Sequence, residues 1–145
     1  MLSLIVLLFV SLSLMVVSVS APWVLCDKNT FLLNFVNHEM LGFLGITVTI
    51  TLASGATLFL DLNKMEEKIG KNIFKKSKLA IRNSCYCLII LLAASVVLVT
   101  IKPLTPDTEI CRSLFNSMAL IIVFANIGIM FDITSMVFQT GNEFE

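Results

Sequence analysis

Long apolar runs separated by short polar stretches occupy almost the whole chain. The runs fall at about residues 2–24, 41–61, 79–101 and 114–138. About 20 apolar residues form a helix long enough to cross a hydrocarbon core of roughly 30 Å, and an unpaired strand could not satisfy its backbone groups in lipid. The pattern therefore predicts an all-α polytopic membrane protein, with four transmembrane helices in a single domain over residues 1–145.

The second run is unusually rich in Gly, Thr, Ala and Ser. At steps of four residues, one side of the expected helix carries Gly45, Thr49, Ala53 and Thr57, and the same row ends at Asp61. Small residues at this spacing let helix backbones approach closely, and threonine hydroxyls can bond to a neighbouring helix or back to their own. We interpret the row as a packing face within the bundle or between protomers. A pore lining or a ligand groove is the alternative.

Positive charge is concentrated between the second and third runs, in residues 62–82. The basic residues of this segment are Lys64, Lys68, Lys71, Lys75, Lys76, Lys78 and Arg82. Apolar residues continue at helical spacing past the second run, and Gly70 followed by Asn72 provides a helix stop and an N-cap. The segment is therefore expected to form a basic hairpin that extends the second and third helices.

The basic hairpin predicts the orientation, because loops rich in Lys and Arg stay on the cytoplasmic side. Both termini are then cytoplasmic, in a bacterial inner membrane, and residues 25–40 and 102–112 face outward. The first run is interpreted as a retained span, because a cleavable signal would carry a basic start and would not have Pro22 after its cleavage site. The hairpin is expected to bind anionic lipid headgroups or an acidic cytoplasmic protein.

The outward loops lead to two further expectations. Between Cys26 and Met40, apolar and polar residues fall on opposite sides of a short interfacial helix that leads into the second span. Cys26 and Cys111 both lie outside, so an oxidising compartment would permit a disulfide between them. Cys85 and Cys87, near the cytoplasmic end of the third span, are interpreted as apolar fillers.

The fourth helix is expected to be longer than a membrane requires. Thr105 is a candidate N-cap and Pro106 a candidate first helical residue. The pattern runs to about Thr140, where Gly141 can end the helix. Some 35 residues would extend roughly 50 Å.

The fourth run is unusual because it places Asn116, Asn126 and Asp132 among apolar residues. At spacings of three and four, a small and polar stripe is formed by Ala125, Gly128, Asp132, Ser135 and Gln139. Such a stripe should face protein or water. Asp61 and Asp132 are expected near the cytoplasmic headgroup level, where each pairs with a lysine or with Arg82. In the alternative, the acids form a ring at a pore mouth that selects cations. Asn126 is expected to form a helix-to-helix hydrogen bond.

Composition agrees with a membrane protein, because 57% of the residues are hydrophobic and 14% are charged. The chain has no nucleophile paired with a base, no phosphate-binding Gly loop and no metal-ligand cluster, so no enzyme, cofactor or metal is expected. No recognisable DNA-binding motif accompanies the basic hairpin, which argues against direct nucleic-acid binding. A transporter is a weaker hypothesis, since it would need a substrate site formed between chains.

The chain resembles the RexB-like phage-exclusion membrane proteins in its four spans, in the Gly/Thr/Ser-rich second span before a basic hairpin, and in the ending Met136-Val137-Phe138-Gln139. In outline it is also similar to the KwaA-type membrane subunits of the Kiwa defence system. The first resemblance implies a small ion channel that depolarises an infected cell. The second implies an oligomeric membrane sensor that holds a cytoplasmic effector.

We expect a homo-oligomer, with a tetramer as the first hypothesis, because spans two and four have small or polar faces that one protomer need not bury. The main functional hypothesis is a non-enzymatic, phage-defence type sensor or scaffold that engages a cytoplasmic effector through the basic hairpin. The alternative hypothesis is a homo-oligomeric ion channel.

Overall fold

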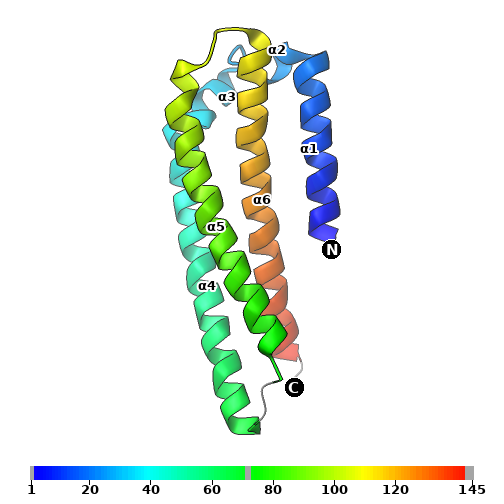
Figure 1. Ribbon diagram of the computed structural model, residues 1–145, viewed down its shortest axis with the longest axis vertical. Helices are drawn as coiled ribbons and strands as arrows, with labels where there is room; N and C mark the ends of the chain where they lie inside the picture. The colour runs from blue at the N-terminus through cyan, green and yellow to red at the C-terminus, as the bar shows by residue number, and fades with distance from the viewer. Residues whose placement is uncertain (1, 71–72, 143–145) are drawn as a thin grey trace.

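The computed structural model describes residues 2–70 and 73–142, and the side chains of residues 5–70 and 73–138 (Figure 1). Its elements, in chain order, are α1 (Leu2–Ser20), α2 (Pro22–Leu25), α3 (Thr30–Asn34), the π-helix η1 (Phe35–Glu39), α4 (Met40–Ile69), α5 (Lys75–Ile101), the 3₁₀ helix η2 (Lys102–Leu104) and α6 (Glu109–Asn142). The described residues are helical apart from short connections, which confirms the predicted all-α class.

Three segments are long and apolar enough to cross a membrane: Thr30–Ile69, Lys75–Leu104 and Glu109–Phe138. The chain is therefore a membrane protein by the length and composition of its helices. The first predicted span is shorter, because α1 stops at Ser20 and a separate helix begins at Pro22. Proline lacks an N–H donor and disfavours helical dihedral angles at the preceding residue, and Ala21 is accordingly non-helical (φ −140°, ψ 61°).

Helices α4, α5 and α6 pack against one another, and α1 packs against α6 (Figure 1). Helices α4 and α6 run in the same direction and α5 runs in the opposite one. We call the end of the bundle that carries residues 21–39 and 102–108 the connector end. The opposite end, where residues 62–82 join α4 to α5, is the hairpin end, and the last turns of α6 lie towards it.

The buried row of α4 follows helical spacing and consists of Met40, Leu44, Val48, Thr51, Gly55, Leu58, Leu62 and Glu66. It packs against apolar side chains such as Leu88 and Ile81 of α5 and Ile133 of α6. At Gly55, helices α4 and α5 approach closely, since a Cβ atom at this position would lie 3.0 Å from Cys85 Sγ. The packing face inside the protomer is therefore this row, and not the small-residue row predicted from the sequence.

The predicted stop of the second helix is confirmed. Gly70 adopts the left-handed conformation (φ 68°, ψ 20°), and its N–H donates to the Glu66 carbonyl at 2.8 Å. Asn72, the predicted N-cap of the next helix, lies outside the described residues. Helix α5 begins at Lys75, with Phe74 in the N-cap position.

The predicted start of the fourth helix near Pro106 is wrong by about three residues. Thr105 is extended, and its hydroxyl donates to the Lys102 carbonyl at 2.6 Å, so it closes η2 instead of capping α6. Thr108 serves the first turn of α6, where its Oγ1 accepts from the Cys111 N–H at 3.4 Å. Helix α6 continues through Gly141 to Asn142, and its 34 residues agree with the expected overlong helix.

The segment before α4 is helical, as predicted, and has one buried side. Leu32, Val36 and Met40 are buried, whereas Asn37 and His38 are exposed. The helix is not continuous, because Val36 (φ −77°, ψ 59°) and Asn37 (φ −151°, ψ −145°) depart from helical dihedral angles. The Val36 carbonyl at this break accepts a hydrogen bond from Lys102 Nζ.

Candidate functional site

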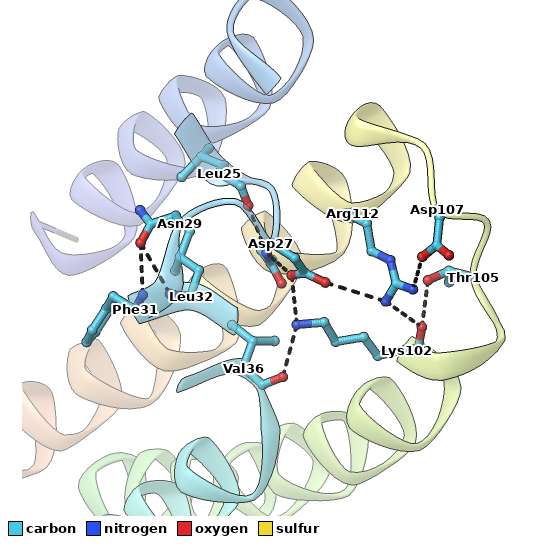
Figure 2. A network of polar contacts seen from close by, with 11 residues as sticks. Leu25, Asp27, Asn29, Phe31, Leu32, Val36, Lys102, Thr105, Asp107 and Arg112 are labelled. Carbon is cyan, nitrogen blue, oxygen red and sulfur yellow. Dashed lines mark hydrogen bonds and ion pairs between the residues drawn. The ribbon is translucent and has the colours of Figure 1, made fainter. Parts of the chain in front are cut away.

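A network of buried and half-buried polar side chains joins the connections at the connector end (Figure 2). We call Asp27, Lys102, Arg112 and Asn116 the connector network. Asp27 follows α2, Lys102 begins η2, and the other two lie on the first turns of α6. The network therefore joins three segments that are far apart in the sequence.

Asp27 is the centre of this network. Its Oδ1 accepts from Lys102 Nζ at 3.1 Å and from Asn116 Nδ2 at 3.0 Å, and its Oδ2 lies 3.6 Å from Arg112 Nη1. Burial raises the pKa of Asp27, but the hydrogen bonds from Asn116 and Lys102 and the charges of Lys102 and Arg112 outweigh this effect. The pKa of Asp27 is therefore lower than its ordinary value, and the carboxylate stays ionised.

Lys102 also connects the network to the broken helix before α4. Its Nζ donates to the Val36 carbonyl at 3.2 Å, where the helical dihedral angles are interrupted (Figure 2). A buried ammonium must be both paired and hydrogen-bonded, and Asp27 and Val36 together meet this requirement. The same contacts hold the α3–α4 break against the start of η2.

Arg112 and Asn116 attach α6 to the other two connections. Arg112 donates to the Lys102 carbonyl at 3.2 Å and to Asp107 Oδ1 at 2.5 Å. Asn116 is fully buried, and its Nδ2 also donates to the Leu25 carbonyl at 2.8 Å. The charged groups of the network therefore pair with one another or with Asp107, and they fasten the start of α6 to the other two connections.

Sequence reasoning singled out Asn116 as polar but did not identify the rest of the network. Sequence spacing does not bring Asp27, Lys102 and Arg112 together, because they lie in separate connections. The signal in the sequence is that one acid, Asp27, and two basic residues, Lys102 and Arg112, lie in the loops that the predicted orientation places on the same side of the membrane. Among the described residues, no group of three or more His, Cys, Asp or Glu side chains could hold a metal ion.

At the hairpin end, a mostly buried ion pair joins Glu66 and Lys78. Glu66 Oε2 pairs with Lys78 Nζ, and Glu66 Oε1 accepts from the Phe74 N–H at 2.8 Å. Lys78 Nζ donates to Asn63 Oδ1 at 3.0 Å and lies 6.0 Å from the centroid of the Phe59 ring. The pair therefore joins α4 to α5 just before and after the turn.

The structure divides the predicted basic residues into two groups. Lys78 forms an ion pair with Glu66 and is half-buried. The exposed basic residues are Lys64, Lys68, Lys75, Lys76 and Arg82. Lys71 lies outside the described residues. Asp61 Oδ1 lies 3.5 Å from Lys64 Nζ, which agrees with the expectation that this aspartate pairs with a lysine.

The predicted small-residue row of α4 lies on the outside of the protomer. Thr49, Ala53 and Thr57 are exposed, and Gly45 is half-buried. Thr49 Oγ1 donates to the Gly45 carbonyl at 2.7 Å and Thr57 Oγ1 to the Ala53 carbonyl at 3.0 Å. The hydroxyls thus bond back to their own helix, and a contact between protomers through this row stays a prediction.

The small and polar residues singled out on α6 differ in their burial and in their neighbours. Ala125, Asp132 and Ser135 are half-buried, and Gly128 borders an apolar groove of about 270 Å³ between α1 and α6. Asn126 is buried, and its Nδ2 donates at 2.9 Å to the Ile122 carbonyl of the same helix. The bond found for Asn126 is therefore local, because the carbonyl one turn earlier is within reach, and it is not the expected helix-to-helix bond.

All four cysteines are free thiols. Cys26 is buried, with its Sγ 3.6 Å from the Trp23 carbonyl oxygen, and Cys111 is half-buried. The expected disulfide between them is therefore not formed in this structure. A comparison with protein-family models, with curated proteins and with solved structures finds no match to this chain.

Proposed function

We propose that the chain is a non-enzymatic subunit of the bacterial inner membrane, and that it acts as an oligomeric sensor or scaffold which engages a cytoplasmic effector through the hairpin end. The phage-defence setting of this proposal comes from the resemblance described above. The observation that carries the proposal is an excess of available positive charge at the hairpin end.

Five of the basic side chains at the hairpin end are exposed: Lys64, Lys68, Lys75, Lys76 and Arg82. The acids nearby are less available, because Glu66 is buried against Lys78 and Asp61 lies beside Lys64. Glu67 is exposed. The remaining positive surface suits an acidic protein partner, since complementary charge steers association and selects partners.

We include α1 as the fourth span of the proposed protomer. Its 19 residues extend roughly 28 Å, close to the thickness of the hydrocarbon core. Ile5, Leu8, Phe9 and Leu12 are all more than half exposed, which suits a lipid environment much better than water. With four spans, both termini and the hairpin end lie on the cytoplasmic side.

Charge reversal tests the scaffold proposal. In cells that express the chain with its neighbouring genes, the variant Lys68→Glu/Lys75→Glu/Lys76→Glu should lose co-purification of the cytoplasmic effector and restore phage plating. The single changes to compare are Lys75→Glu and Lys28→Glu, because both reverse one exposed charge, and Lys28, which pairs with the exposed Glu109, lies at the connector end. Lys28→Glu should keep the effector, whereas Lys75→Glu should weaken its recovery. Equal recovery in the triple variant and the wild type would contradict the proposal.

A cation channel is the second candidate, and it rests on polar groups that face out of the bundle. Ser54, Thr57 and Asp61 of α4 and Thr134 of α6 border one open groove near the hairpin end. In an oligomer, such groups could line a cation path. Purified oligomer in planar bilayers should then carry cation currents that weaken in Asp61→Asn and Asp132→Asn, and silence of the wild-type oligomer would exclude the channel.

A further inference from the structure

The open groove between α4 and α6 near the hairpin end has a volume of about 340 Å³. Its lining combines three hydroxyls and one carboxylate with three apolar side chains: Ser54, Thr57, Leu58 and Asp61 of α4, and Thr134, Val137 and Phe138 of α6. A groove on the outside of a membrane bundle is filled by lipid unless another helix covers it. Its chemistry decides which lipid fits.

The polar groups of this groove can accept hydrogen bonds but have few hydrogens left to donate. Ser54 Oγ donates to the Ile50 carbonyl at 3.0 Å, Thr57 Oγ1 to the Ala53 carbonyl at 3.0 Å, and Thr134 Oγ1 to the Met130 carbonyl at 2.8 Å. A hydroxyl has a single hydrogen and two lone pairs, so each retains accepting capacity only. The Asp61 carboxylate is also an acceptor. The groove therefore favours a ligand that is cationic and rich in N–H donors.

Asp61 lies where the apolar part of α4 ends. From Met40 to Asp61 the helix rises roughly 30 Å, which is about the thickness of the hydrocarbon core. The carboxylate is therefore expected at the level of the lipid headgroups. Lys64 Nζ is 3.5 Å from Asp61 Oδ1, and the two side chains are 71% and 49% exposed, so the rim presents a negative and a positive group side by side. An exposed pair of this kind is weak, and a zwitterionic headgroup can exchange with it.

We propose that this groove binds the headgroup of a phospholipid with a primary ammonium, namely phosphatidylethanolamine. The ammonium donates to the Asp61 carboxylate and to the Thr57 hydroxyl oxygen, and the phosphate accepts from Lys64. Leu58, Val137 and Phe138 cover the adjoining methylene groups. Phosphatidylcholine fits poorly because its quaternary ammonium has no N–H donor, and the anionic headgroups of phosphatidylglycerol and cardiolipin offer the groove no positive charge for Asp61.

A methylation series of the headgroup tests this inference directly. The purified full-length protein is equilibrated with equal amounts of two phospholipids that differ only in headgroup, and bound lipid is counted by native mass spectrometry. Phosphatidylethanolamine should be retained about tenfold over phosphatidylcholine, and the mono- and dimethylated headgroups should fall in between. In Asp61→Asn the preference should shrink to nearly equal retention, and Thr57→Val should lower it partly.

Glu67→Gln is the matched control, because it removes one exposed negative charge of α4 that does not line the groove. It should retain the wild-type preference. If Glu67→Gln and Asp61→Asn lose the preference for phosphatidylethanolamine equally, the inference is overturned. Equal retention of all four headgroups by the wild type would overturn it as well. Displacement of the lipid by potassium chloride alone, without dependence on methylation, would assign the groove to an inorganic cation. A change of oligomer mass in Asp61→Asn without a change in bound lipid would assign it to a second copy of the chain.

Discussion

The ammonium of Lys102 lies 3.1 Å from Asp27 Oδ1, and the two side chains are only 10% and 22% exposed. The same ammonium donates to the Val36 carbonyl at the break before α4. One lysine therefore holds together the connection after α2, the break before α4 and the end of α5. The arrangement fixes how the long helices are joined at the connector end.

Removal of Lys102 should destabilise the protein strongly. Lys102→Met leaves the Asp27 carboxylate and the Val36 carbonyl without the ammonium, and loss of one partner of a mostly buried pair costs about 2–4 kcal/mol. Thermal unfolding of the purified protein in detergent measures the effect. Asp107→Asn is the control, because the Asp107 side chain is 92% exposed and such a pair contributes less than about 1 kcal/mol. The double variant Asp27→Asn/Lys102→Met should cost less than the sum of the single changes, and strict additivity would contradict a coupled pair.

The lowered pKa of Asp27 predicts how stability depends on pH. The folded state holds the ionised carboxylate, so its contribution is complete above the ordinary pKa of 3.8. It is lost as the pH falls from there through the lower pKa of the folded state. Thermal midpoints measured across this acidic range should therefore fall more steeply for the wild type than for Asp27→Asn. Parallel curves for the two proteins would show that Asp27 titrates alike in the folded and unfolded states.

Local features of the helices could be predicted from the sequence because they depend on neighbouring residues. The left-handed stop at Gly70, the overlong α6 and the basic residues of the hairpin all follow from local composition and spacing. Pro22 and Trp23 predict the end of the first span, and α1 ends slightly earlier, at Ser20, before a separate helix that begins at Pro22.

The inward face of α4 could not be predicted in the same way. In a membrane helix, apolar residues occur on the lipid side as well as on the protein side, so hydrophobicity alone does not identify the packed face. The small-residue row was a reasonable choice, but the helices approach at Gly55. The connector network could not be predicted from the sequence either, because its residues belong to separate connections and come into contact only when the bundle is folded.

The close approach at Gly55 predicts a position-specific cost of adding one methyl group. In Gly55→Ala the new Cβ would lie 3.0 Å from Cys85 Sγ and 3.6 Å from Ile81 Cγ2, and overpacking of this kind costs about 1–3 kcal/mol. Gly45→Ala is the matched control, since nothing lies within 4 Å of its added Cβ, and alanine favours a helix by up to about 1 kcal/mol. Alanine brings the same helix preference at position 55, so thermal unfolding should place Gly55→Ala below Gly45→Ala by the cost of the close contact. Cys85→Ala should remove part of the stability loss caused by Gly55→Ala. If the double variant is no more stable than expected from the two single changes, the added methyl group does not clash with Cys85.

Within the small-residue row of α4, the exposed residues Thr49 and Ala53 predict where protomers meet, whereas Thr57 at the end of the row borders the lipid groove. Ala53 is exposed, so a leucine there fits the isolated protomer but prevents the close approach of a second helix. Ala53→Leu should therefore weaken self-association about tenfold or more, measured as the mass of the detergent-solubilised protein over a dilution series, with unchanged helical content. Ala94→Leu is the matched control, because Ala94 is an exposed alanine of α5 outside the row, and it should keep the wild-type mass. If both variants dissociate equally, or if neither does, the row is not the interface, and its small residues face lipid.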